Sequence, residues 1–299
     1  MKRIFLYTLC LSVLITACNK EDAFKPDNSL IPPPSQAYNK SNVSYGSDAL
    51  QAMDIYLPAG RSASATKVFI FIHGGAWAEG DKADADHAPL IDSLKRRLPD
   101  WAIFNLNYRL AGLQGVTLRN KFPAQEEDIK KAIQYIYDRR QDFTISDKWV
   151  FAGASAGAHL AMLQGYKYNS PIKPKAIIDL FGPNDMAALY NSYNNSDPGE
   201  ALLISMLMSG TPSSNPTMYH DSSPFNYVTA QSAPTIIFHG GLDDVVPKEQ
   251  SYTLEAKLKS AGVNTQLVYY ENQTHGWSDP AIWYDCLNKA QGFLNTNVQ

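Results

Sequence analysis

Short runs of β-branched and aromatic residues alternate with helix-like segments along most of the chain, and this alternation restricts its fold more than any other feature. The run Lys67–Ile72 (KVFIFI) has the composition of a buried strand. The segment Pro123–Arg139 has helical spacing and acidic residues in its first turn. The other expected strands cover residues 52–57, 101–107, 149–152, 175–181, 234–239 and 265–270, and the other expected helices cover residues 88–98, 156–163, 251–260 and 282–294. Strands that alternate with helices predict an α/β fold, with a mostly parallel central sheet and helices on both faces.

Residues from about 184 to 229 interrupt this alternation. The segment is rich in Tyr, Asn, Ser and Pro and holds one apolar stretch, Ala201–Met208. We therefore expect a small cap-like insertion over the sheet, within a single domain at 41–299, and not a second domain.

The N-terminus has the pattern of a secretory signal peptide at residues 1–17. Two basic residues precede a mostly apolar segment at 4–15, which is too short to span a bilayer. The run Leu14–Cys18 resembles the bacterial lipobox. That resemblance implies cleavage before Cys18 and attachment of lipid to this residue, whereas ordinary cleavage would leave Cys18 as a free thiol.

The residues after Cys18 are typical of a tether. Lys20–Asp22 looks like the acidic export signal of Bacteroidetes surface lipoproteins. The segment 18–40 is polar and contains Pro32–Pro34, so we expect an extended linker between a lipid anchor and the domain. These features predict a secreted lipoprotein of the outer membrane, on its periplasmic or cell-surface face.

Cysteine usage and charge exclude several classes of protein. Cys10 would leave with the signal peptide and Cys18 would carry lipid, so Cys286 is the one cysteine left in the domain. A single cysteine cannot form an internal disulfide, and we expect Cys286 to be buried. The net charge is -3 and the charges are scattered, so the chain lacks the basic stripe of a nucleic-acid-binding protein. No metal-ligand spacing of the HExxH type occurs, and no phosphate-binding glycine motif follows a strand. We expect neither a metal nor a cofactor.

A strand, a turn and a helix meet at residues 149–163, and the turn reads Gly-x-Ser-x-Gly. Its glycines are Gly153 and Gly157, and its serine is Ser155. In this setting the motif is a nucleophile elbow, in which a strained turn exposes the serine hydroxyl. The alternative is an ordinary glycine-rich turn, so the assignment of Ser155 as a nucleophile depends on its partners.

A second glycine-rich turn follows the strand Lys67–Ile72 and reads His73–Trp77 (HGGAW). Backbone N–H groups in such a loop can stabilise negative charge on a reacting oxygen. We assign this role to the N–H groups of Gly75 and Ala76, with Gly74 as an alternative, and the N–H of Ala156 completes the oxyanion hole. Without the other motifs, this segment would be interpreted as a plain turn.

An acid and a base follow the last strands. Asp243 and Asp244 come after the strand at 234–239, and either could orient a histidine, although such a pair is often a solvated turn. His275 follows the strand at 265–270 and is placed to act as general base toward Ser155. The order of these groups along the chain matches α/β-hydrolases and differs from chymotrypsin and subtilisin.

The remaining histidines and aromatic residues have weaker assignments. We expect His73 to brace the oxyanion loop, His159 to pack the elbow helix and His239 to be structural. We expect His87 and His220 to be solvated. Trp77, Tyr190 and Tyr193 could line an apolar or sugar-facing wall of the site, or could serve packing alone.

Six segments resemble an α/β-hydrolase of the carbohydrate-esterase group, and the likeness extends over about residues 45–295. They are His73–Lys82, Asn107–Leu110, Phe122–Asp128, Gly153–Ala161, His239–Pro247 and Thr274–Trp277. The likeness is to Bacteroidetes feruloyl/acetyl esterases and to neighbouring hormone-sensitive-lipase-like esterases. It implies that the acid is Asp243, not Asp244. Ala76 departs from the lipase-like pattern, which has a third glycine at this position.

The resemblance implies a serine ester hydrolase that removes acetyl or feruloyl groups from polysaccharide through an acyl-enzyme. Because the pattern HGGxW also occurs in kynurenine formamidases, a formamidase-like amidase is an alternative. A general short-chain carboxylesterase or lipase is another. A catalytically dead hydrolase that serves as a binding module would usually lack one of Ser155, Asp243 and His275, and all three are present.

Overall fold

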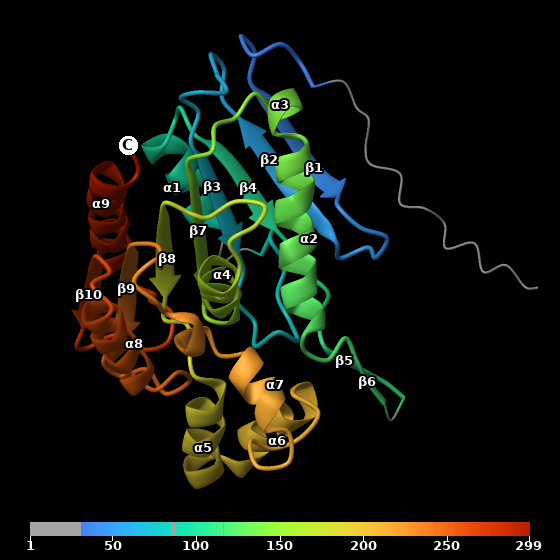
Figure 1. Ribbon diagram of the computed structural model, residues 1–299, viewed down its shortest axis with the longest axis vertical. Helices are drawn as coiled ribbons and strands as arrows, with labels where there is room; N and C mark the ends of the chain where they lie inside the picture. Colours follow the sequence, from blue (N-terminus) through green and yellow to red (C-terminus); the bar gives the residue numbers. More distant parts are fainter. Residues whose placement is uncertain (1–30, 85–87, 116) are drawn as a thin grey trace, which may run out of the picture.

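A twisted sheet of eight strands forms the centre of the computed structural model, which describes residues 31–84, 88–115 and 117–299 (Figure 1). The strand order is β1-β2-β4-β3-β7-β8-β9-β10. The strands are β1 (Tyr38–Ser44), β2 (Ala52–Leu57), β3 (Val68–Ile72), β4 (Ala102–Leu106), β7 (Trp149–Ala154), β8 (Ala176–Leu180), β9 (Thr235–Gly240) and β10 (Thr265–Tyr270). The antiparallel pairs are β1 with β2 and β2 with β4, and all other neighbours are parallel.

The side chains of β3 show how the sheet is buried on both sides. Val68, Ile70 and Ile72 belong to the core under one layer of helices, and Phe69 and Phe71 belong to the core under the other. A strand at the middle of a parallel sheet has no solvated face, so a continuous apolar run is required there and an alternating pattern is not.

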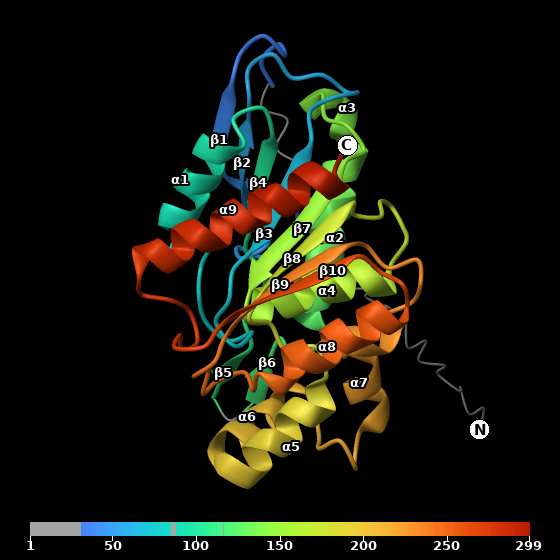
Figure 2. The same ribbon diagram turned by 90° about the vertical axis from the view of Figure 1, so that its left-hand side faces the viewer.

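Helices cover both faces of the sheet (Figure 2). One face carries α1 (Ala88–Arg97) and α9 (Pro280–Asn297), and the other carries α2 (Ala124–Asp138), α4 (Ala156–Lys167) and α8 (Glu249–Ser260). A short helix, α3 (Arg140–Phe143), follows α2. The expected α/β architecture, with a mostly parallel sheet between two helical layers, is confirmed.

Short helices extend the molecule beyond the carboxyl ends of the parallel strands (Figure 1). They are α5 (Met186–Ser196), α6 (Pro198–Leu207), α7 (Pro216–Asp221) and the 3-10 helix η1 (Pro224–Tyr227), and all of them lie between β8 and β9. The carboxylates of Asp185 and Asp197 accept hydrogen bonds from backbone N–H groups at the starts of α5 and α6. A separate two-stranded sheet is formed by β5 (Gly112–Gln114) and β6 (Thr117–Arg119).

The N-terminal boundary of the fold lies earlier than expected, because β1 starts at Tyr38. Arg61 is buried, and its guanidinium donates to the carbonyl oxygens of Pro32 and Gln36 at 2.5 Å each. The same side chain donates to Phe143 O at 3.0 Å. A polar, proline-rich segment is thus held on the domain through its backbone carbonyls. The expected tether therefore ends before residue 32, and the rest of it, with the signal peptide and Cys18, lies outside the described residues.

Within the described ranges, no helix combines the length and the apolar character that a membrane span requires. Cys286 in α9 is a free thiol, 1% exposed, that packs into the apolar core between α9 and the sheet. This placement confirms the expectation that Cys286 is a small buried apolar residue.

Removal of the Arg61 guanidinium should destabilise the whole domain. We expect Arg61→Ala to lower the free energy of unfolding by about 2–4 kcal/mol, because at least three carbonyl groups, including that of the buried Phe143, lose a charged donor. Urea unfolding measures this change. The control is Arg96→Ala, which removes an exposed guanidinium that donates a hydrogen bond to the Ser93 hydroxyl. Equal stability of the two variants would contradict this role of Arg61.

Candidate active site

Ser155 occupies a strained turn between β7 and α4. Its backbone angles are φ 52° and ψ -122°, a conformation that residues with a side chain rarely adopt. The turn is held because Ser155 N donates to Leu180 O at 2.8 Å. Strain of this kind costs about 1–3 kcal/mol and persists only where the surrounding structure enforces it.

The glycines on either side of Ser155 are required by close backbone packing. A Cβ atom on Gly153 would lie 2.3 Å from the carbonyl carbon of Gly157. A Cβ atom on Gly157 would lie 2.1 Å from Ile72 O and 2.3 Å from His73 O. The start of α4 therefore packs directly against the end of β3, and only glycine permits this approach.

A line of hydrogen bonds joins Ser155, His275 and Asp243. The Nε2 atom of His275 lies 3.0 Å from the hydroxyl oxygen of Ser155, and its Nδ1 atom lies 2.8 Å from Asp243 Oδ2. A carboxylate only accepts hydrogen bonds, so Nδ1 donates to Asp243 and Nε2 is left to accept from the serine hydroxyl. The His275 side chain is 19% exposed and the Asp243 side chain is fully buried.

The second oxygen of Asp243 is held by its own loop. Oδ1 accepts from the N–H groups of Val245 and Val246 at 2.9 and 2.7 Å. Asp244, the other acid that the sequence left open, is exposed. The structure thus brings Asp243, and not Asp244, against His275.

His239 is a second histidine beside Asp243. Its Nε2 atom lies 3.5 Å from Asp243 Oδ2 and 2.9 Å from Val246 O, and its Nδ1 atom lies 2.8 Å from the Ser251 hydroxyl. Burial lowers the pKa of His239, and the Asp243 carboxylate opposes that shift. A neutral ring that donates from Nε2 and accepts at Nδ1 satisfies these contacts. His239 therefore supports the loop that carries Asp243, a more specific role than the structural one expected.

The loop after β3, where the oxyanion hole is expected, has an unusual backbone. Gly75, Ala76 and Trp77 have positive φ angles of 108°, 47° and 61°. The N–H groups of Gly75, Ala76 and Ala156 donate no hydrogen bond within the part of the chain that the structure describes. Tyr108 donates to His73 O and Gly74 O at 3.2 Å each, and its ring stacks on His73. The expected bracing role of His73 is consistent with this stacking.

Trp77 points into the protein interior. It is 5% exposed, and its Nε1 donates to Nδ1 of His159 at 3.2 Å. The other ring nitrogen of His159 donates to Ser222 O at 2.6 Å, so His159 links the oxyanion loop to the segment between β8 and β9. Burial lowers the pKa of His159 to about 4, which keeps the ring neutral. Of the two roles open for Trp77, the structure favours packing over a substrate-facing wall.

Phe181 is a site residue that the sequence did not reveal. It follows β8 with a positive φ angle of 49°, and its ring lies 4.9 Å from the ring of His275, edge to face. Only its position directly after a strand could have pointed to it. Tyr190 and Tyr193, the other expected wall residues, contact the ring of Tyr219 and the carbonyl oxygen of Val245.

Among the described residues, no group of three or more His, Cys, Asp or Glu side chains is arranged to hold a metal ion. The exposed side chain of His220 pairs with Asp221 at 3.0 Å, as expected for a solvated histidine, and His87 lies outside the described residues.

The architecture and this arrangement define an α/β-hydrolase fold. The family model described as BD-FAE matches residues 53–258, which is more than half of the chain. The chain belongs to the BD-FAE family.

The chain is also similar to curated proteins and to a solved structure. Esterase LipC of Mycobacterium tuberculosis is 26% identical over 249 residues, which are 78% of this chain and 58% of LipC. A kynurenine formamidase of Meyerozyma guilliermondii is 31% identical over 160 residues, which are 50% of this chain and 55% of that enzyme. The chain thus spans little more than half the length of these relatives. A truncated carbohydrate esterase from gut microbiota has a similar fold, with a TM-score of 0.72 at 24% identity, covering 90% of this chain and 99% of that one.

The buried carboxyl group of Asp179 makes stability depend on pH. Asp179 lies in β8, where Oδ1 accepts from Gly182 N at 2.8 Å and Oδ2 has no hydrogen-bond partner among the described residues. Burial raises the pKa of Asp179 from 3.8 to about 7. Between these values the folded state keeps a proton that the unfolded state releases, so stability falls as pH rises.

We expect Asp179→Asn to remove this contribution. The unfolding free energy of the variant minus that of the wild type should increase by at least about 2 kcal/mol as the pH rises from about 4.5 to about 7.5. Urea unfolding of both proteins at several pH values measures this difference. The contributions of other titrating groups, such as His159, are the same in both proteins and cancel. A difference that does not vary with pH would show that Asp179 does not titrate in this range.

Proposed function

We propose that this chain is a serine esterase that removes acyl groups from carbohydrate. The observation that supports it most strongly is the line of atoms in which His275 lies 3.0 Å from Ser155 and 2.8 Å from Asp243. In this proposal Ser155 is the nucleophile, His275 the general base and Asp243 the residue that orients and stabilises the histidine.

In the first step, His275 Nε2 takes the hydroxyl proton while the Ser155 oxygen attacks the ester carbonyl carbon. The resulting imidazolium is stabilised by the Asp243 carboxylate at Nδ1. When the tetrahedral intermediate collapses, His275 gives the proton to the leaving alcohol, and the acyl group stays on Ser155.

The N–H groups of Gly75, Ala76 and Ala156 would bind the oxyanion. They donate to no other acceptor in the described part of the structure, so an ester oxygen meets donors that are already free. Ala156 is also the first residue of α4, and the positive end of the helix dipole favours negative charge there. Water activated by His275 then attacks the acyl-enzyme by the same route and releases the acid.

A carbohydrate ester is the substrate that the comparisons favour. The carbohydrate esterase from gut microbiota shares the fold over nearly the whole chain. The expected export of the protein would expose it to polysaccharide, whose acetyl or feruloyl groups are the esters in question.

A second candidate activity is hydrolysis of an N-formyl amide. The identity of 31% to a kynurenine formamidase over 160 residues favours it. Both reactions use the same nucleophile and differ in the leaving group, which is an alcohol in one and an amine in the other.

Replacement of Ser155 should abolish hydrolysis. We expect Ser155→Ala to reduce kcat for nitrophenyl acetate by about 10⁴-fold or more, because the variant lacks the hydroxyl on which the acyl-enzyme is proposed to form. Paraoxon should phosphorylate the wild type on Ser155 and leave the variant unmodified, which intact-mass spectrometry detects. Equal hydrolysis by both proteins would contradict the role of Ser155.

The same two proteins can separate the candidate substrates. Acetylated xylo-oligosaccharides, methyl ferulate and N-formylkynurenine present an acetyl ester, a feruloyl ester and a formamide. A kcat/KM highest for N-formylkynurenine would favour the amidase. A kcat/KM highest for the acetylated xylo-oligosaccharides would favour the proposed carbohydrate esterase, and one highest for methyl ferulate would favour an esterase with a feruloyl preference.

We also propose that lipid on Cys18 anchors the protein to the outer membrane. The lipobox-like run Leu14–Cys18 supports this location. We expect Cys18→Ser expressed from the full chain to appear in the soluble fraction, whereas the wild type stays with membranes and takes up labelled fatty acid. Soluble wild-type protein without label would contradict the anchor.

A further inference from the structure

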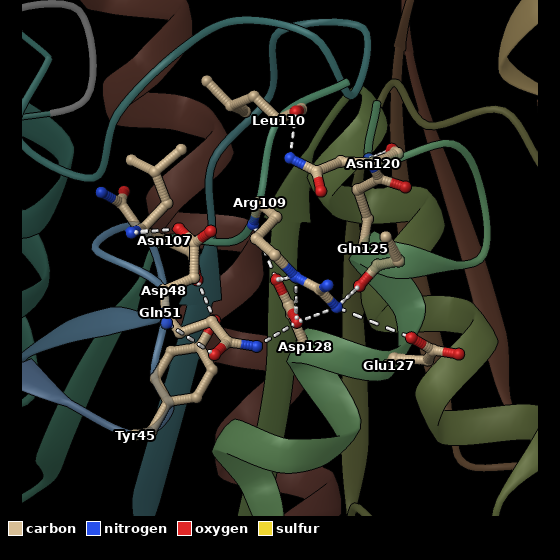
Figure 3. A network of polar contacts seen from close by, with 12 residues as sticks. Tyr45, Asp48, Gln51, Asn107, Arg109, Leu110, Asn120, Gln125, Glu127 and Asp128 are labelled. Atoms are coloured by element: carbon tan, nitrogen blue, oxygen red, sulfur yellow. Dashed lines mark hydrogen bonds and ion pairs between the residues drawn. The ribbon is translucent and has the colours of Figure 1, made fainter. Parts of the chain in front are cut away.

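A polar pocket that Ser155 does not line opens beside the start of α2. Figure 3 shows the network of polar contacts around Arg109 and Asp128 in its walls. Its volume is about 460 Å³, within the range of about 300–1,000 Å³ that small-molecule sites occupy. Its walls come from the turn between β1 and β2, from Arg109 after β4, from Asn120 after β6 and from α2. Its lining is polar and charged throughout and consists of Ser47, Asp48, Gln51, Arg109, Asn120, Glu127, Asp128 and Lys131.

The floor of this pocket is rigid. The Asp128 carboxylate accepts from Arg109 N at 2.8 Å, from Arg109 Nη2 at 2.7 Å and from Gln51 Nε2 at 2.6 Å. The Asp128 side chain is 1% exposed, so these bonds are shielded from water. Arg109 and Gln51 are therefore held in place before any ligand arrives.

The walls of the pocket keep both donors and acceptors available. Arg109 Nη1 and the side-chain oxygen of Asn120 have no hydrogen-bond partner among the residues that the structure describes. The Glu127 carboxylate is 66% exposed, and one of its oxygens lies 3.6 Å from Arg109 Nη2. Asp48 lies in the facing turn, where its Oδ1 accepts from Leu50 N.

This mixture of groups selects a neutral ligand with several hydroxyl groups. An anion would meet the carboxylates of Asp48 and Glu127, and a cation would meet Arg109 and Lys131. An apolar ligand would leave these polar groups without partners. A hydroxyl group both donates and accepts, so the neighbouring hydroxyls of a sugar ring match adjacent donors and acceptors.

A short series of contacts inside the protein joins a wall of the pocket to the Ser155 site. A Cβ atom on Gly74 would lie 3.3 Å from the Cβ of Ser155, and Tyr108 donates to Gly74 O at 3.2 Å. Arg109 is the next residue after Tyr108. Both sites also lie at the end of the sheet where β3, β4 and β7 finish.

We propose that this pocket binds a sugar residue of the same polysaccharide whose ester group reaches Ser155. The inference rests on the proposed function, because it assigns to the pocket a part of that substrate. The inference also extends the proposed function, because a sugar subsite gives the enzyme a preference for oligosaccharide esters over simple esters.

Binding can be measured without turnover in full-length Ser155→Ala. Isothermal titration uses unacetylated xylotetraose, mannotetraose and cellotetraose as probes. We expect at least one to bind, and we expect Glu127→Ala in the same background to weaken its binding about tenfold. Ser47→Trp, which places an indole at the exposed rim, should block the pocket. The matched control is Asp138→Ala, an exposed acid at the far end of α2, which should leave binding unchanged.

A second measurement uses enzymes that retain Ser155. The ratio of kcat/KM for an acetylated oligosaccharide to that for nitrophenyl acetate should fall about tenfold in Glu127→Ala and in Ser47→Trp, and should stay constant in Asp138→Ala. Failure of all three tetraoses to bind, or equal binding by the pocket variants and their parent, would overturn the subsite. Because titration needs no hydrolysis, tetraose binding by a protein that hydrolyses no ester would refute the proposed function and leave the subsite standing.

Discussion

The contact between the first turn of α4 and the end of β3 is the constraint on which the site depends. Gly157 approaches the carbonyl oxygens of Ile72 and His73 so closely that no side chain fits between them. This contact sets the distance between the turn that carries Ser155 and the loop that carries Gly75. The Ser155 hydroxyl and the N–H groups of Gly75 and Ala76 are thus placed relative to each other by backbone packing, which is stiffer than any arrangement of side chains.

Around this rigid centre, buried histidines serve as neutral connectors. His159 joins the indole of Trp77 to the carbonyl oxygen of Ser222, and His239 joins Ser251 to the loop of Asp243. Each ring accepts at one nitrogen and donates from the other, which only the uncharged form can do. Burial keeps both rings in that form.

Most of the sheet and the helices could be predicted because buried parallel strands are continuous apolar runs. β1 could not, since only one residue of Tyr38–Ser44 is buried, which leaves no periodic signal. The motifs around Ser155 and His275 were visible as strand-to-loop turns. The contact of Trp77 with His159 was not, because it joins residues 82 positions apart and follows from tertiary packing alone. The polar pocket could not be predicted either, because tertiary packing brings its lining residues together from separate parts of the chain.

The bond from the Tyr193 hydroxyl to Val245 O has a consequence for how such a molecule diversifies. It ties α5 to the loop whose N–H groups hold Asp243. The segment between β8 and β9 therefore cannot be replaced without an effect on the loop that holds Asp243. A replacement that moves α5 would also move Asp243. Under the proposed mechanism, new substrate preferences introduced through this segment would therefore lower turnover unless Tyr193 or an equivalent donor is retained.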